Sequence, residues 1–330
     1  MPRTATRRRA LAAALACAAM LSACTGNSDD GTAGTGVSAT PVVAADAADT
    51  TAASAVGAAA TASLDASAAG AAARSKAFVG AALQSANAYA KTLPGRTAAE
   101  KADAELATTG VKVLALSRAG DAPAQILAQT TLKKTGAAVL VLLVGGQSGA
   151  PFKAAAVTPM LPDAKLDALD PTSDGSAAIA DGKGLSAKPD DVVKAFAASV
   201  KYPDPTATKV LADDPLSEQL RQSARAQSQA LNNQGAFTQE HEPKGVIGGL
   251  RLKDGNGAIV FAHLVRSDAI AMRTPVKLTP AKDLTLLTGI KQITTEANLT
   301  SNEIVAIVIP ASGQARIVAA SDQLVAGSGR

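Results

Sequence analysis

The chain has 330 residues, with no tryptophan, two tyrosines, five phenylalanines and two histidines, and its formal net charge is +4. Four of its 32 basic residues lie within residues 1–23, which contain no acidic residue. The 28 basic residues of the rest of the chain therefore equal its 28 acidic residues in number. This balance argues against a nucleic-acid partner, because binding nucleic acid needs a strongly basic surface.

Residues 1–23 have the layout of a bacterial signal peptide. Four arginines precede the apolar run Ala10–Leu21, which is shorter than the ~20 residues that span a bilayer. The following Leu21-Ser22-Ala23-Cys24 resembles the lipobox of bacterial lipoproteins. The resemblance implies cleavage before Cys24, attachment of diacylglycerol to its thiol, and anchoring at the extracytoplasmic face of the cell membrane.

Two alternatives to this interpretation of the leader stay open. An ordinary secretory signal could be cut after Ala23, and the run "TRRRAL" partly matches a twin-arginine signal, so the export route is not fixed. Because Cys17 lies inside the leader, the mature chain keeps Cys24 alone. We therefore expect no disulfide, no metal site and no cofactor.

Residues 24–60 are rich in alanine, threonine, serine and glycine and contain no aromatic residue. Such a composition buries too little apolar surface to offset the entropy of ordering, which predicts a disordered tether. Order is expected to begin at residue 61, and residues 61–170 are predicted to form a first α+β domain. The run "SKAFVGAALQSANAYAKTL" favours a helix ending at Pro94-Gly95. Four strands in hairpin order follow it, within Gly110–Arg118, Pro123–Lys134, Ala137–Gly146 and the run "PFKAAAVTPM".

A polar loop between Leu161 and Lys188 suggests a linker, assigned to residues 171–187, and a second α+β domain over residues 188–330 with a core of its own. Helices are predicted in "KPDDVVKAFAASVKY" and in "DDPLSEQLRQSARAQSQALNN", whose apolar stripe is interrupted by Gln227. The strands expected after them are Ala236–Glu242, Val246–Lys253, Ala258–Arg273, Asp283–Glu296, Glu303–Ile309 and Ala315–Ala320.

Helices followed by an antiparallel sheet, twice, resemble tandem domains of the cystatin-like and nuclear-transport-factor-like superfamily, in which a curved sheet wraps a helix to form a cone. The segments "LADDPLSEQLRQSARAQSQALNNQGAF", "GGLRLKDGNGAIVFAHL" and "PFKAAAVTPMLP" are also similar to a family of actinobacterial lipoproteins. The resemblance implies an α+β fold and carries no activity onto any residue.

No motif predicts catalysis. Lys134-Thr135-Gly136 lacks the partner motifs of penicillin-recognising enzymes, and "VGGQSGAP" lacks the spacing of a phosphate loop or nucleophile elbow, so both are interpreted as turns. His241 lies between two glutamates and is expected at a solvated strand end. His263 shares a strand face with Ile259, Phe261 and Val265, and we expect a structural histidine that hydrogen-bonds a neighbour.

These observations lead to three hypotheses of function. The first is a non-enzymatic lipoprotein that binds another envelope protein or a secretion component. The second is a carrier of a small apolar ligand or lipid in a cone pocket. The third is an enzyme, in which His263 would face an acidic residue inside an open cone.

Overall fold

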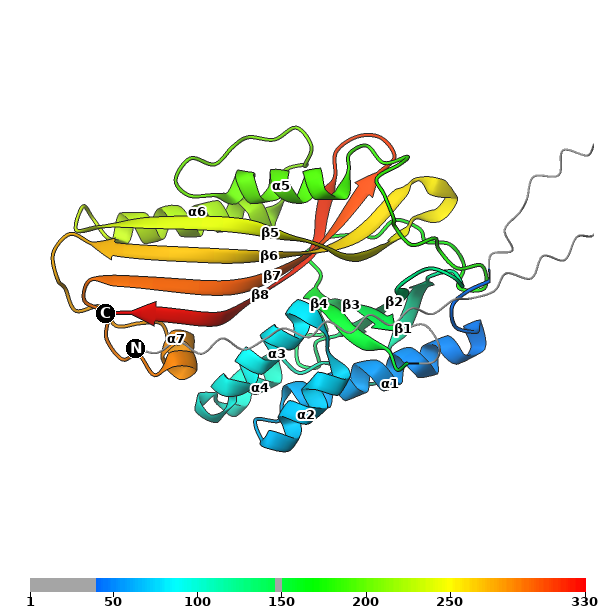
Figure 1. Ribbon diagram of the computed structural model, residues 1–330, viewed down its shortest axis with the longest axis horizontal. Coiled ribbons are helices and arrows are strands. Elements are labelled where there is room, and N and C mark those ends of the chain that lie inside the picture. Colours follow the sequence, from blue (N-terminus) through cyan, green and yellow to red (C-terminus); the bar gives the residue numbers. More distant parts are fainter. Residues whose placement is uncertain (1–39, 146–149) are drawn as a thin grey trace, which may run out of the picture. The chain divides into compact units, whose positions relative to one another are not determined.

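The computed structural model describes residues 40–145 and 150–330 (Figure 1). The predicted α+β class is confirmed: helices precede each of two four-stranded antiparallel sheets, ordered β1-β2-β3-β4 and β5-β6-β7-β8. The predicted signal peptide, the lipid-attachment residue Cys24 and the first part of the tether lie outside the described residues. No helix of the described part combines the length and the apolar composition needed to cross a membrane.

The first sheet is the predicted meander of short hairpins. Its strands are β1 Lys112–Leu116, β2 Ala124–Thr131, β3 Ala138–Gly145 and β4 Lys153–Pro159. Every residue of β3 from Val139 to Leu143 is buried, because helices cover one face of this sheet and the second sheet packs on the other. Such a strand forms a continuous apolar run without alternation.

Five helical segments precede the first sheet in the chain: α1 Ala45–Ser63, α2 Ala68–Ala77, α3 Gly80–Thr92, the 3-10 turn η1 Leu93–Gly95, and α4 Ala98–Asp103. Helix α1 corrects the prediction that residues 24–60 are disordered throughout. Its stripe Ala48, Ala52, Val56 and Ala59 is almost fully buried. Small side chains allow the helix to approach the sheet closely, and Asp49 accepts a hydrogen bond from the backbone of Val113 at 3.1 Å.

The helix predicted across Ser75–Leu93 is interrupted at Phe78 and Val79. Both residues are extended, and the backbone amide of Val79 donates to the carbonyl of Ala154 on β4 at 3.0 Å. Phe78 is thereby buried in the core while Val79, expected on the buried stripe, is exposed. The tertiary contact of Phe78 outweighs the continuous helical pattern of the sequence.

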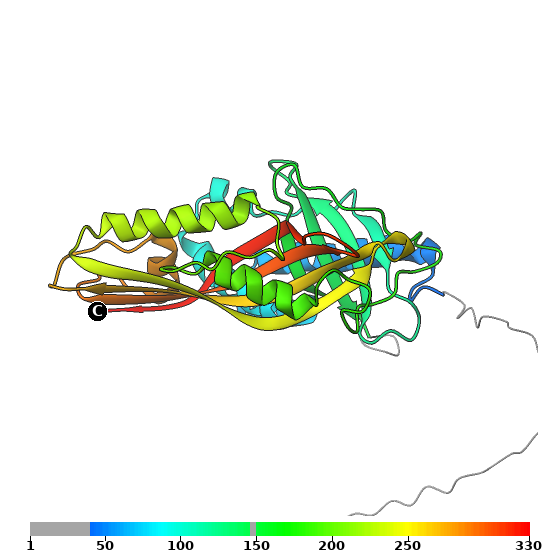
Figure 2. The ribbon, with the colours of Figure 1, turned by 90° about the horizontal axis from the view of Figure 1, so that it is seen from above.

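The second sheet has longer strands: β5 Gly235–Arg251, β6 Gly257–Met272, β7 Glu296–Pro310 and β8 Arg316–Gly329. Strand β5 joins two predicted strands, with register shifts at Pro243/Gly245 and Val246/Gly248. The predicted hairpin between β5 and β6 contains the 3-10 turn η2 Lys253–Gly255. Helices α5 Pro189–Val200 and α6 Pro215–Ala230, both predicted, lie over one face of this sheet (Figure 2).

One predicted strand, Asp283–Glu296, is wrong. Residues Lys282–Thr288 form helix α7, which ends at Gly289 in the left-handed conformation (φ 79°) with its amide bonded to the carbonyl of Thr285. Leu284 is buried against Gly327 on β8, where a β-carbon would lie 2.4 Å from a Leu284 methyl group. The apolar run of leucines thus serves one short helix that covers the sheet, and β7 begins only at Glu296.

The two halves share their largest apolar core, contrary to the expectation of a separate core for each. This cluster combines α1–α3 and the first sheet with Ile259, Phe261 and Ile304 of the second sheet. Gln125 of β2 also connects the sheets, because its buried side-chain oxygen accepts the amide hydrogen of Gly249 at 2.9 Å. A second cluster, between the other face of the second sheet and α5, contains Val193, Phe196 and Val260.

The segment predicted as an interdomain linker packs along both sheets. Ser176 pairs with Ser117 beside β1, while Leu169 and Ala178 pair with the residues around the end of β5. Ser176 is fully buried. The segment therefore forms part of the contact between the two halves.

Candidate functional site

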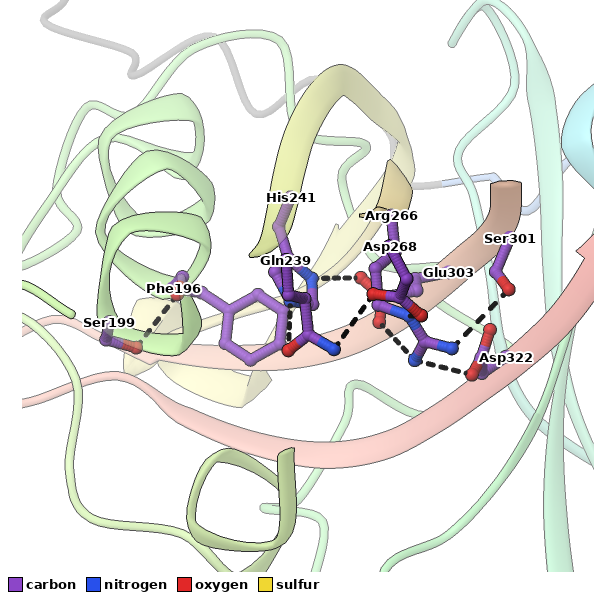
Figure 3. A network of polar contacts seen from close by, with 9 residues as sticks. All are labelled: Phe196, Ser199, Gln239, His241, Arg266, Asp268, Ser301, Glu303 and Asp322. Atoms are coloured by element: carbon purple, nitrogen blue, oxygen red, sulfur yellow. Dashed lines mark hydrogen bonds and ion pairs between the residues drawn. The ribbon is translucent and has the colours of Figure 1, made fainter. Parts of the chain in front are cut away.

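A cluster of polar side chains, most of them buried, lies on the helix-covered face of the second sheet (Figure 3). Strand pairing aligns β5, β6 and β7 so that alternate residues of each strand point to this face. The cluster consists of Gln239 and His241 from β5, Arg266 and Asp268 from β6, Ser301 and Glu303 from β7, and Asp322 from β8. Phe196 of α5 covers it, with its ring 6.2 Å from that of His241 in an edge-on arrangement.

Five of these side chains form a closed ring of polar contacts. His241 Nδ1 lies 2.6 Å from Glu303 Oε2, and His241 Nε2 lies 3.2 Å from Gln239 Oε1. The Gln239 amide nitrogen donates to Asp268 Oδ1 at 3.0 Å. Arg266 Nε donates to Asp268 Oδ2 at 3.1 Å, and its Nη1 closes the ring at 3.4 Å from Glu303 Oε1. The ring satisfies polar groups that would be costly to bury unpaired.

The ring fixes the hydrogens of His241. Because the Gln239 nitrogen donates to a carboxylate, its oxygen must face the histidine, and an amide oxygen only accepts. His241 Nε2 therefore carries a hydrogen. The short contact on the other side then needs one hydrogen between Nδ1 and the Glu303 carboxyl group, so a hydrogen bond joins the two side chains.

Arg266 is the centre of charge in the cluster. Besides the two ring carboxylates, its Nη1 contacts Asp322 Oδ2 at 2.7 Å, and its Nη2 is 3.5 Å from the hydroxyl of Ser301. Burial by itself would lower the pKa of Arg266. The negative charges of Asp322, Asp268 and Glu303 together raise it by more, so the pKa lies above its ordinary value. Burial raises the pKa of Asp322, and Arg266 opposes that shift. Arg266 therefore carries its positive charge.

A cavity of about 390 Å³ lies between this cluster and helix α6. Its wall on the sheet side includes Gln239, Arg266, Glu303 and Asp322. Its wall on the helix side combines apolar with neutral polar side chains, namely Leu216, Gln219, Leu220, Ser223 and Gln227. The predicted interruption of the apolar stripe by Gln227 thus falls at the cavity.

His241 was expected at a solvated strand end, and this prediction is wrong. Its side chain is fully buried, because α5 covers the strand face to which it points. The sequence carries one signal of this arrangement: Phe237, Gln239 and His241 alternate on one strand face, while Arg266 and Asp268 alternate in a strand expected to be central. Charges in a central strand need buried partners.

His263 lies on the opposite face of the sheet, with Ile259 and Phe261 as predicted. It is half-buried, and its Nε2 lies 3.1 Å from Oδ1 of Asn302. The Asn302 amide nitrogen in turn donates to Gln84 Oε1 of α3 at 3.1 Å. The expectation that His263 hydrogen-bonds a neighbour is confirmed.

A second, apolar pocket of about 290 Å³ borders α3. Its wall includes Phe78, Ala82, Ala86, Leu106 and Ile304, together with Tyr89. The hydroxyl group of Tyr89 is buried and has no hydrogen-bond partner among the described residues. Burial raises the pKa of Tyr89, so its hydroxyl group is a neutral donor.

The remaining motifs follow the interpretation as turns where they are described. Lys134-Thr135-Gly136 lies between β2 and β3, and Lys134 pairs with Asp103 at 2.6 Å. Residues 146–149 of "VGGQSGAP" lie outside the described residues. Within the described ranges, no group of three histidine, cysteine or acidic residues has a geometry that could hold a metal ion. The chain matches no protein-family model, no curated protein and no solved structure.

Proposed function

We propose that the protein is a lipid-anchored, extracytoplasmic binding module without enzymatic activity, whose partner is another envelope protein. The observation that supports the absence of catalysis is the bonding of His241. A general base needs a ring nitrogen with a free lone pair within reach of the substrate. Both nitrogens of His241 are occupied by hydrogen bonds, to Gln239 and Glu303, and the side chain is fully buried.

The interior between the sheets supports the same proposal. Isoleucine, leucine, valine and phenylalanine side chains fill the face that carries His263, and the histidine bonds Asn302. An enzyme of the cone type would need this histidine to open onto a cavity beside an acidic residue.

The anchor can be tested with the two cysteines of the chain, Cys17 and Cys24. Cys24→Ser should abolish metabolic labelling with palmitate and release the protein from the membrane fraction, because serine lacks the thiol that accepts the lipid. The matched control is Cys17→Ser, which alters a cysteine that leaves with the signal peptide and should keep the label. Labelling that persists in Cys24→Ser would contradict the anchor.

The partner can be sought by crosslinking on native membranes with the anchored protein. A protein partner should form a crosslinked product with the surface of the folded chain. That product should disappear when the membrane is stripped of the partner. Turnover of envelope substrates by the purified protein would contradict the non-enzymatic proposal.

The Tyr89 pocket favours a second candidate function, the carriage of a small apolar ligand with one hydrogen-bonding group. An unpaired hydroxyl group in an apolar pocket is costly, and a ligand could satisfy it. Indole, which can bond the hydroxyl, should bind more tightly than toluene. Tyr89→Phe should remove that preference without lowering the melting temperature, whereas Tyr202→Phe should change neither. Absence of binding by both probes would contradict this candidate.

A further inference from the structure

The cavity beneath α6 has a wall of unusual charge, and its charges can be counted from the hydrogen bonds. The sheet side contributes the carboxyl groups of Glu303 and Asp322 and a single guanidinium group, that of Arg266, which also pairs with the carboxyl group of Asp268. The hydrogen between His241 and Glu303 leaves that pair without net charge, and Arg266 neutralises one of the other two carboxylates. One negative charge is left over at the cavity.

Of the three carboxyl groups, that of Asp322 is the one that a ligand can reach from the cavity. The side chain of Asp322 is 42% exposed, whereas those of Glu303 and Asp268 are 5% and 10% exposed. Asp322 contacts Arg266 through one carboxylate oxygen, Oδ2. Burial raises its pKa, which means that its surroundings disfavour the charge it carries. A cation placed at the rim would relieve this cost.

The other wall of the cavity is suited to contact a short alkyl chain. Leu216 and Leu220 of α6 are half-buried and face the cavity together with the neutral side chains of Ser223 and Gln227. Among the described residues that line it, Arg266 is the one cationic side chain. A volume of about 390 Å³ lies within the range of small-ligand sites.

We propose that this cavity binds an alkylammonium or alkylguanidinium group, with its charge at Asp322 and its alkyl part against Leu216 and Leu220. The group could belong to a free amine or to a lysine or arginine side chain of a protein. The inference goes beyond the proposed function and does not depend on the lipid at Cys24. The closed ring of Arg266, Asp268, Gln239, His241 and Glu303 would hold the charged wall in place.

Calorimetric titration of the mature protein in detergent tests the proposal. The probes are n-butylguanidinium and n-butylammonium, with n-butyrate and n-butanol as counter-probes of equal length. Both cations should bind saturably, and butyrate should not. N-acetyl-arginine-methylamide distinguishes the two sources: tighter binding than butylguanidinium indicates a protein side chain, and weaker binding a free amine.

Two variants locate the site. Asp322→Asn should weaken the binding of both cations by about tenfold or more, since it removes a charge-assisted contact. Ser223→Trp fills the cavity from α6 and should abolish binding without altering the ring. The matched control is Glu240→Gln, which alters an exposed carboxylate of β5 that pairs with Lys201 at 2.9 Å. This variant should bind both cations with unchanged affinity. No saturable binding by the folded protein, equal binding of butyrate, or unchanged affinity in Asp322→Asn would overturn the proposal.

Discussion

The two histidines of the chain lie on opposite faces of one sheet and have opposite surroundings. His241 is fully buried beneath α5 in a ring of polar and charged side chains, whereas His263 is half-buried beside apolar residues and has one amide partner, Asn302. Their local sequences suggest the reverse, since His241 lies between glutamates and His263 between apolar residues. The environment of a strand residue depends on what covers its face, which its chain neighbours do not determine.

The two faces of the second sheet also differ in what they join. The face of His263 belongs to the core shared with the first sheet, and the face of His241 is covered by α5 and α6 from its own half. The first face therefore determines whether the halves are independent, and the second holds the charged cavity.

The largest effect should come from separating the halves. Residues 188–330 alone would expose Ile259, Phe261 and Ile304, which the first half covers in the intact chain. We expect this fragment to lack a cooperative thermal transition in circular dichroism, because an uncovered apolar sheet face cannot be stabilised in water. The comparison is residues 40–330, which should unfold cooperatively. A folded fragment would show that the shared core is dispensable.

Removal of the central charge on the other face should have the next largest effect. Arg266→Met leaves Asp268 and Glu303 buried without their cation, and we expect a loss of about 3–5 kcal/mol in the free energy of unfolding. Urea denaturation measures it. Arg225→Met, on the exposed side of α6, should stay within about 0.5 kcal/mol of the original protein. Equal costs for both variants would contradict the central role of Arg266.

The two histidines can be compared directly by the same substitution. His241→Gln removes the short bond to Glu303 and should cost about 1.5–3 kcal/mol, typical of a hydrogen bond to a charged group. His263→Gln disturbs one neutral bond to Asn302 and should cost about 1 kcal/mol. Urea midpoints of the two variants give the order. A larger cost at His263 would contradict the expectation that the bond of His241 to Glu303 contributes more to stability than the bond of His263 to Asn302.

The smallest effect concerns an exposed ion pair that connects the halves outside the core. Glu100 of α4 accepts from Lys282 at 2.7 Å and from the amide of Thr97, and these bonds lower its pKa to about 2. Since the pKa is lower in the folded state than the ordinary value near 4.3, the stabilisation is present above that value and is lost as the pH falls toward 2.

The contribution of this pair can be tested by measuring the free energy of unfolding as a function of pH, with unfolding followed by circular dichroism. Glu100→Gln should flatten the fall in stability between about pH 5 and pH 2, because the variant has no carboxylate to protonate. Glu242→Gln, an exposed glutamate of β5 whose partner Lys244 lies on the same strand, is the control. An unchanged acid profile in Glu100→Gln would show that the pair contributes nothing measurable.

The sequence by itself determined the class of the fold and most of its elements. The meander β1–β4, helices α5 and α6, and the hairpin between β5 and β6 follow from local periodicity and turn residues, which act over a few residues. The bond of His263 to a neighbour also followed from its strand face. Local pattern failed where packing decided the conformation, at α1, at the break before Val79 and at α7.

The tertiary structure alone decided the candidate site. Gln239, His241, Arg266, Asp268 and Glu303 span three strands, and each is an ordinary polar residue until strand register aligns them. Helix α5 covers part of this face, and the burial of most of these groups makes each one costly if unpaired, which is why they form a closed ring. The shared core has the same origin, because burial of Ile259 and Phe261 depends on residues more than a hundred positions away.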